Sequence, residues 1–153
     1  MTMSDKSAAI VRQNDARVLR AFGLELRILL DGERTGGTLA MWTNITPPGG
    51  GPPPHYHLND DETFHVIEGR VVFFLNGEWT EVGPGGTAFM PRGIVHTFKN
   101  VGDEPSRMLN MTAPSGFEKF FARCADEFAK GDNPDMSRIA EIGVEHGIHF
   151  LQG

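Results

Sequence analysis

Two stretches of the chain decide its fold, and the first, residues 49–69, reads GGGPPPHYHLNDDETFHVIEG. Its spacing is G-x5-H-x-H-x4-E-x6-G, which places His55, His57 and Glu62 between two glycines. His55 and His57 are two residues apart on an extended segment, so both imidazoles project from the same face. Glu62 follows a polar turn and begins a strand that we expect to return alongside the histidine segment.

The second stretch, residues 85–100, reads GGTAFMPRGIVHTFKN and contributes a third histidine. His96 follows a Pro-Arg-Gly turn, where a strand would re-enter the interior. With the first stretch it gives three imidazoles and one carboxylate, a donor set that suits Fe, Ni, Mn, Co, Cu or Zn. We therefore expect a transition-metal site, and the donor set does not specify the element. The alternative is a motif kept for structure without its metal, but all four donor residues are present.

Length and composition limit the class of protein. The 153 residues correspond to one domain, and 19 Gly and 10 Pro favour many turns and short strands. A net charge of −6 argues against a general nucleic-acid or anionic-membrane binder. No stretch approaches the ~20 apolar residues of a membrane span, and the polar N-terminus lacks a secretory signal. The single cysteine, Cys124, excludes an intramolecular disulfide. We expect a cytoplasmic protein without nucleic-acid or membrane partners.

Short strands are predicted by alternating or continuous apolar residues through the middle of the chain. Asn76-Gly77 lies between the β-prone runs 71–75 and 78–82, and this dipeptide is the strongest short hairpin signal. The register pairs Leu75 with Glu78. Further strands are predicted at 24–28, 38–46, 87–90, 97–99 and 108–111. So many short strands at this spacing suit only a sandwich or a small barrel.

The predicted hairpin has apolar residues on both of its faces. Phe74 pairs with Trp79, and with Val72 they form the face that does not line the interior. A second sheet, the helices or another subunit must cover that face.

The last forty residues are predicted to form two amphipathic helices. The apolar stripe of the first consists of Phe117, Phe120, Phe121, Cys124 and Phe128. The second is predicted to have Asn133 as its N-cap, Pro134 in its first position and Gly147 at its end, with a buried stripe of Met136, Ile139 and Ile142. We expect both helices to pack on the outer face of the barrel, with the gating of a ligand as the alternative. Within its stripe Cys124 is expected to be buried and unreactive.

The two motifs resemble the paired signature of the cupin superfamily at every fixed position, and the resemblance covers about residues 35–112. The part from PPGGGPPPHYH to ETFHVIEG is also similar to small single-domain cupins described as quercetin-dioxygenase-like. This resemblance implies a mainly β fold, an antiparallel jelly-roll barrel of six to eight strands, here with two C-terminal helices. It also implies one divalent metal inside the barrel, with His55, His57, Glu62 and His96 as ligands.

The predicted organisation follows from this resemblance. We expect an N-terminal arm at 1–15, the cupin barrel at 16–112, and a helical extension at 113–153 that packs on the barrel. Cupins of this size are commonly homodimers, and a homodimer would cover the face formed by Val72 and its neighbours.

The resemblance implies a metal-dependent dioxygenase that acts on a small oxygenated molecule, aromatic or enediol-like. Glu62 inherits the role of a catalytic base that also binds the metal, because a cation stabilises the oxyanion that forms when the carboxylate takes a proton. Two alternatives stay open, since one fold supports unlike functions. One is a metal-dependent isomerase or lyase that uses no oxygen. The other is a non-enzymatic protein that binds or senses a small molecule.

Four residues are predicted for the substrate pocket. If Glu62 points inward, Phe64 points inward too because side chains alternate along a strand, and His65 then points outward as a non-ligand. Phe73 and Phe98 are expected to line an apolar cavity, although ordinary core packing predicts the same placement. Arg92 could meet an anionic substrate at the mouth, and the alternative is a solvated turn residue.

The remaining polar residues near the motifs are expected to have no role in the site. Asp60 and Asp61 are predicted to be solvated, and Tyr56 to face away from the metal because it alternates with two histidines. His146 and His149 are predicted to be surface or packing residues.

Overall fold

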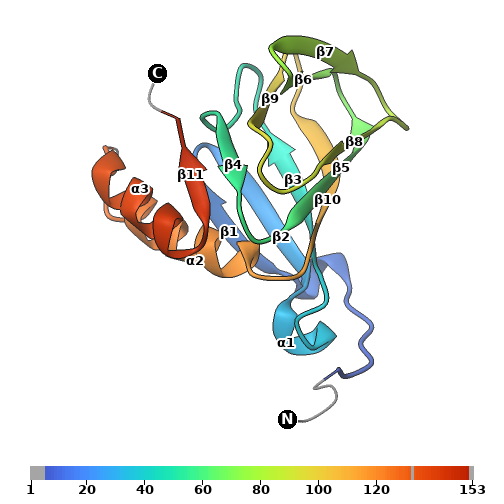
Figure 1. Ribbon diagram of the computed structural model, residues 1–153. Helices are drawn as coiled ribbons and strands as arrows, with labels where there is room; N and C mark the ends of the chain where they lie inside the picture. Colours follow the sequence, from blue (N-terminus) through green and yellow to red (C-terminus); the bar gives the residue numbers. More distant parts are fainter. Residues whose placement is uncertain (1–5, 132, 152–153) are drawn as a thin grey trace.

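Two antiparallel sheets face each other in this structure, a computed structural model that describes residues 6–131 and 133–151 (Figure 1). One sheet has six strands in the order β1 (Arg17–Ala21), β2 (Leu24–Leu30), β3 (Ala40–Thr46), β10 (Ser106–Ala113), β5 (Asp61–Glu68) and β8 (Thr87–Met90). The other has five in the order β11 (Ile148–Phe150), β4 (His55–His57), β9 (His96–Asn100), β6 (Val71–Leu75) and β7 (Glu78–Val82). The helices are the short η1 (Gln13–Asp15) and α1 (Gly32–Thr35), then α2 (Phe117–Phe128) and α3 (Met136–Glu145).

This architecture confirms the predicted fold class, a mainly β antiparallel jelly-roll barrel with two C-terminal helices, and the barrel takes the form of a sandwich of two facing sheets. The described residues form more strands than the six to eight that the resemblance implied, because short strands such as β1 and β11 extend the edges of both sheets. Residues 1–5 of the predicted N-terminal arm lie outside the described residues. No helix in the described part of the chain is long and apolar enough to cross a membrane.

Alternation along the central strands aims one face of each strand into the space between the sheets. In β3, β5 and β10 every second residue is buried over most of the strand. The inward residues of β3 are Ala40, Trp42, Asn44 and Thr46. Polar side chains therefore share the interior with aromatic ones, and such buried polar groups need hydrogen-bond partners or a ligand.

The hairpin between β6 and β7 forms as predicted. Asn76 and Gly77 both have positive φ, 54° and 79°, as a two-residue turn of type I′ requires. Leu75 pairs with Glu78 and Phe74 with Trp79, in the register expected from the sequence.

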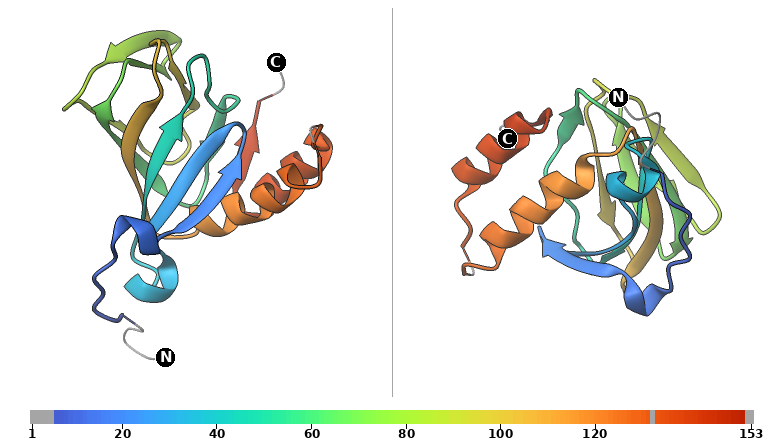
Figure 2. Two further views of the ribbon diagram at one scale, coloured as in Figure 1. Left: turned by 180° about the vertical axis from the view of Figure 1, so that it is seen from behind. Right: turned by 90° about the horizontal axis from the view of Figure 1, so that it is seen from below.

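Helices α2 and α3 close one side of the sandwich (Figures 1 and 2). α2 packs on β1, α3 packs on β11, and the two helices contact each other, so they connect the edge strands of the two sheets. The expectation that they pack on the outer face is wrong for α2. Its Phe120 and Phe121 are buried and line an interior cavity. An outer position would have left the opening between these edge strands exposed to water.

α3 begins two residues later than the sequence predicts. The N-cap is Asp135, whose carboxylate accepts hydrogen bonds from the backbone N–H groups of Ser137 and Arg138. Met136 consequently lies in the first turn and is 49% exposed, whereas the predicted stripe residues Ile139 and Ile142 are buried. Gly147 follows the helix with a φ of 74°, as predicted for its end.

Candidate metal centre

The four predicted ligand residues come together from both sheets. His55 and His57 lie on β4, and His96 lies on the neighbouring strand β9, directly opposite His55. Glu62 lies at the start of β5 in the facing sheet. The expectation that the Glu62 strand returns alongside the histidine segment is therefore wrong, because β5 pairs with β10 and β8 instead. The turn between His57 and Glu62 crosses from one sheet to the other.

The potential ligand atoms of these residues all lie within 4.8 Å of one another. Oε1 of Glu62 is 3.0 Å from Nε2 of His96 and 3.4 Å from Nε2 of His57. All four side chains are buried. The cluster is thus a closed set of three nitrogen donors and one oxygen donor, the kind that binds a divalent transition metal.

The second nitrogen of each imidazole is held by an acceptor outside the cluster. Nδ1 of His55 donates to the carbonyl oxygen of Pro53 (2.8 Å), and Nδ1 of His96 donates to that of Ile94 (3.1 Å). A ring nitrogen that faces a carbonyl oxygen carries the proton, so the other nitrogen presents its lone pair. Both Nε2 atoms are therefore oriented as metal ligands.

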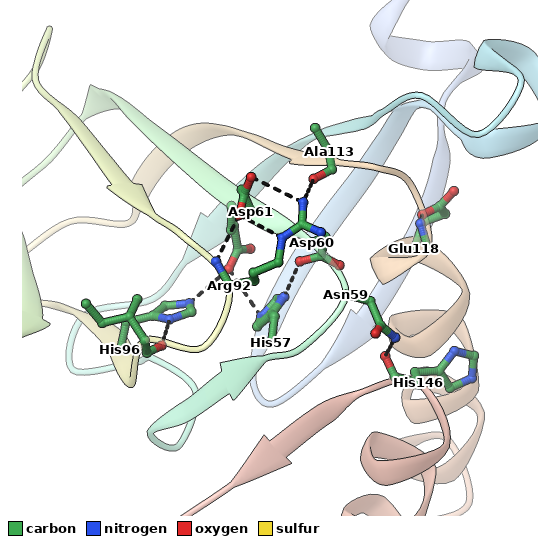
Figure 3. A network of polar contacts seen from close by, with 12 residues as sticks. His57, Asn59, Asp60, Asp61, Arg92, His96, Ala113, Glu118 and His146 are labelled. Atoms are coloured by element: carbon green, nitrogen blue, oxygen red, sulfur yellow. Dashed lines mark hydrogen bonds and ion pairs between the residues drawn. The ribbon is translucent and has the colours of Figure 1, made fainter.

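Nδ1 of His57 contacts a carboxylate rather than a carbonyl group. Oδ1 of Asp60 lies 2.6 Å from it, and the Asp60 side chain is buried (Figure 3). The expectation that Asp60 is solvated is wrong. The spacing of three residues after His57 in a polar turn carries a weak signal for this contact, since a carboxylate often supports a ligand histidine in this way.

The electrostatics of the cluster favour a cation at its centre. Burial, together with His96 and His57, lowers the pKa of His55 to about 3, so this imidazole is neutral at pH 7. For His57, burial acts to lower the pKa, but the carboxylates of Glu62 and Asp60 outweigh burial and raise it. For Glu62, burial acts to raise the pKa, but the surrounding histidines outweigh burial and lower it, so the carboxylate is ionised.

The environment of His57 shows that these residues fit a divalent metal. Nε2 of His57 is buried without a hydrogen-bond partner and faces the Glu62 carboxylate. When Nε2 presents its lone pair, that lone pair and the carboxylate oxygen repel each other unless a cation lies between them, and an unpartnered buried polar atom is costly. The donor set does not specify the element.

An aromatic cavity of about 30 Å³ adjoins the cluster. Its lining includes His55, Glu62, Trp42, Phe64, Phe98, Phe117, Phe120 and Phe121. The ring of Phe117 stacks on His57 at 5.6 Å between centroids and on Trp42 at 4.8 Å. The phenylalanines of α2 thus form a wall of the cavity. Sequence reasoning missed them because a helical apolar stripe does not indicate which surface it contacts.

The residues predicted for the substrate pocket lie in different places. Phe64 and Phe98 line the cavity, whereas Phe73 packs against both of them and is not part of the lining. Arg92 is exposed at the surface, where its guanidinium forms an ion pair with Asp61 at 3.1 Å (Figure 3). This pairing lowers the pKa of the Asp61 carboxyl. Arg92 is accordingly a surface turn residue, the alternative that the sequence left open.

Other residues are placed as the sequence predicts. His65 points away from the cluster and its Nδ1 lies 2.9 Å from the Thr87 hydroxyl. Tyr56 also faces away and stacks on His149 at 5.1 Å between centroids. His146 lies beside Arg123, outside the cluster.

Comparisons with known proteins agree with this geometry. Residues 43–112 match the family model described as Cupin domain. The chain is 26% identical over 102 residues to quercetin 2,3-dioxygenase from Bacillus subtilis, and the match covers 67% of this chain and 30% of that protein. It is 35% identical over 96 residues to polyketide synthase CurC from Streptomyces cyaneus, with 62% of each chain covered. Both matches thus span less than two thirds of the relative's length.

A solved structure supports the same fold. The polyketide cyclase RemF from Streptomyces resistomycificus superposes with a TM-score of 0.62 and 27% identity. The match covers 71% of this chain and 81% of RemF.

Proposed function

Because this chain is a small protein of the cupin superfamily, we propose that it is a metal-dependent dioxygenase acting on a small oxygenated molecule, aromatic or enediol-like. The observation that carries the proposal is the buried cluster of His55, His57, Glu62 and His96 beside an aromatic cavity. When bound, a divalent transition metal supplies a Lewis acid for the substrate oxygens and, if it is redox-active, a route for electrons to O2.

Different residues of the chain have different roles in the proposed reaction. The three histidines hold the metal, and Asp60 orients His57 through its Nδ1. Glu62 is ionised and lines the cavity, so it can accept a proton from a substrate hydroxyl as well as bind the metal. The aromatic walls exclude water and offer ring faces to a planar substrate.

The size of the cavity adds a condition to this proposal. A cavity of about 30 Å³ is much smaller than the ~150 Å³ that holds benzene in a protein interior. A ring-shaped substrate therefore requires the side chains of Phe117, Phe120 and Phe121 to move outward with α2. Since these three side chains form the wall between the edge strands, α2 is the element through which a substrate would reach the metal.

A second candidate function is non-oxidative chemistry at the same site, such as isomerisation, elimination or cyclisation. The matches to CurC and RemF favour it, because both names refer to polyketides, which carry acidic C–H bonds on carbon atoms that lie between two carbonyl groups. Glu62 would then take a proton from carbon, and no oxygen would be consumed.

The proposal also covers assembly and location. We propose a homodimer that covers the outer face of the β6–β7 hairpin, where Trp79 is 52% exposed and contacts Phe74 at 5.4 Å between centroids. A cytoplasmic location is consistent with a chain whose single cysteine cannot form an internal disulfide.

Oxygen consumption by the metal-loaded protein tests the proposed function. The protein is loaded separately with Fe(II), Ni(II), Mn(II), Co(II), Cu(II) and Zn(II), then incubated with catechols, flavonols, enediols and 1,3-diketones in an oxygen electrode. Glu62→Gln removes the base, and Glu68→Gln, at the exposed end of the same strand, is the matched control.

The outcomes separate the candidate functions. Oxygen uptake that is lost in Glu62→Gln and kept in Glu68→Gln supports the dioxygenase. Product formation under argon supports the non-oxidative enzyme. Thermal stabilisation by a compound without any product would contradict both and indicate a binding or sensor protein.

A further inference from the structure

Buried polar atoms without partners lie on the wall of the six-stranded sheet. Among the described residues, Nε1 of Trp42 and Oδ1 of Asn110 have no hydrogen-bond partner, and both residues line the cavity. Trp42 and Asn110 are 1% exposed. Oγ1 of Thr112, on the same inward face of β10, is also without a partner. Most buried polar groups in proteins are paired, so this group calls for an explanation.

The sheet register places the residues that carry these atoms on neighbouring positions of one face. Asn110 on β10 lies directly opposite Trp42 on β3, and residues so paired have Cβ atoms about 5 Å apart on the same face. Thr112 lies directly opposite Glu62 on β5. Asn110 is two residues from Thr112 along β10, so the Trp42–Asn110 pair is displaced roughly 7 Å along the strand direction from the Glu62 position, and Trp42 lies one strand farther across the sheet than Asn110.

The chemistry of the pair indicates what it can bind. The Trp42 indole is a hydrogen-bond donor only, whereas the Asn110 amide has an accepting oxygen and a donating nitrogen. A hydroxyl group accepts from the indole N–H and at the same time donates to the amide oxygen. An alkyl group would leave both atoms unpaired in an aromatic surrounding, which is the costly case.

We propose that Trp42 and Asn110 form a subsite that recognises a hydroxyl group of the substrate, remote from the oxygen atoms that bind the metal. The inference rests on the proposed function and narrows its substrate class to polyhydroxylated aromatic molecules. Such a molecule carries two adjacent oxygens for the metal and a further hydroxyl across the ring. Phe117 stacks on Trp42, so α2 covers this subsite when it closes.

Matched probe molecules test the subsite without turnover. The probes are 1,2,4-trihydroxybenzene and 4-methylcatechol, which share the chelating pair and differ in a hydroxyl against a methyl group. Their Kd values are measured by calorimetry under argon with the Zn(II)-loaded protein, with Trp42→Phe, which removes the N–H, and with Asn110→Leu, which removes the amide. Metal per chain and Tm are measured for each variant, to establish that it is folded and loaded.

The wild-type protein is expected to bind the trihydroxy compound about tenfold more tightly than 4-methylcatechol, the effect of one well-placed hydrogen-bonding group. In each folded variant the two probes are expected to bind about equally, because the trihydroxy compound loses a hydrogen bond and 4-methylcatechol leaves one fewer buried polar atom unpaired. The indole proton of Trp42, assigned by its absence in Trp42→Phe, moves downfield in the 1H–15N spectrum with the trihydroxy compound only.

Two kinds of result overturn the inference, and they differ in what they imply for the proposed function. Equal affinity of the wild type for both probes, or a preference that survives both substitutions, contradicts the subsite and leaves the proposed function standing; the two polar groups then pair only with water. Failure of the Zn(II)-loaded protein to bind either probe contradicts the chelating aromatic substrate itself, and the subsite with it. If a substitution unfolds the protein, the other variant still decides. The indole proton of Trp42 can then be assigned with Trp79→Phe, which removes the signal of the second of the two tryptophans.

Discussion

Oδ1 of Asp60 lies 2.6 Å from Nδ1 of His57 (Figure 3), whereas the Glu62 carboxylate faces Nε2 on the other side of the imidazole ring. His57 thus lies between two carboxylates: Asp60 contacts Nδ1, and Glu62 faces Nε2, the nitrogen that would bind a metal. An acceptor at Nδ1 fixes the tautomer and ring orientation of a ligand histidine and makes its other nitrogen more basic.

We predict that Asp60→Ala weakens metal binding about 10- to 100-fold, the usual effect of losing such a supporting group. Asp60→Asn is predicted to lose less, because an amide oxygen still accepts from Nδ1. Competition with a coloured chelator measures both affinities. The control is Asp61→Asn, one residue away, where the carboxylate pairs with Arg92 at the surface. Equal losses in the Asp60 and Asp61 variants would show that the His57 contact does not orient a ligand.

The closure of the sandwich by α2 predicts a large effect of Phe121 on stability. Its side chain is 2% exposed and contacts Phe22 and Phe117. Phe121→Ala is predicted to lower the free energy of unfolding by about 3–5 kcal/mol, the usual cost of deleting a buried phenylalanine ring. Denaturant unfolding measures it, with Phe89→Ala at a 57% exposed position as control, where a change within about 0.5 kcal/mol is expected. A small effect at Phe121 would mean that α2 is not packed between the edge strands.

Cys124 is predicted to be unreactive in the native protein. Burial raises the pKa of its thiol to about 12, so at pH 8 about one molecule in ten thousand carries the reactive thiolate. The native protein should therefore react with a thiol-specific disulfide reagent only as fast as it unfolds, and the denatured protein at once. The raised pKa also means that any stability linked to this thiol is present below pH 9 and lost as the pH rises toward 12. Fast labelling of the native protein at pH 8 would contradict the buried position.

The homodimer proposal predicts a mass of twice 16.8 kDa by light scattering after size exclusion. Trp79→Lys places a charge on the outer face of the β6–β7 hairpin and is predicted to give the monomer, because an unpaired buried charge is costly at an interface. Phe89→Lys, on the edge strand β8 of the other sheet, controls for a general effect of lysine and should stay dimeric. A monomeric wild type, or a dimer that Trp79→Lys leaves intact, contradicts this interface.

Local chemistry made part of the structure predictable. The Asn76-Gly77 turn determines the register of its hairpin because few residues adopt two consecutive positive φ values. The four candidate ligands were predictable because their spacing has a local structural meaning. His55 and His57 alternate on one extended segment, and His96 directly follows a turn. Alternation along β5 likewise predicted that Phe64 points inward and His65 outward.

Contacts between distant segments were not predictable in the same way. The pairing of β5 with β10 and β8, rather than with β4, depends on the long-range sheet order and has no local signal. The stripe of Phe117, Phe120 and Phe121 predicts a buried helix face but not the cavity that this face lines. The burial of Asp60 depends on a turn that crosses between the two sheets, whereas its sequence surroundings are those of a solvated loop.

Metal content of the purified, untagged protein tests the central claim most directly. It is measured by elemental analysis beside His96→Ala, which removes the imidazole that lies 3.0 Å from Glu62. We predict about one equivalent of a divalent transition metal per wild-type chain and a large loss in the folded variant. A wild-type protein that holds no metal after incubation with each candidate ion, or a His96→Ala variant that holds as much as the wild type, would contradict the metal centre.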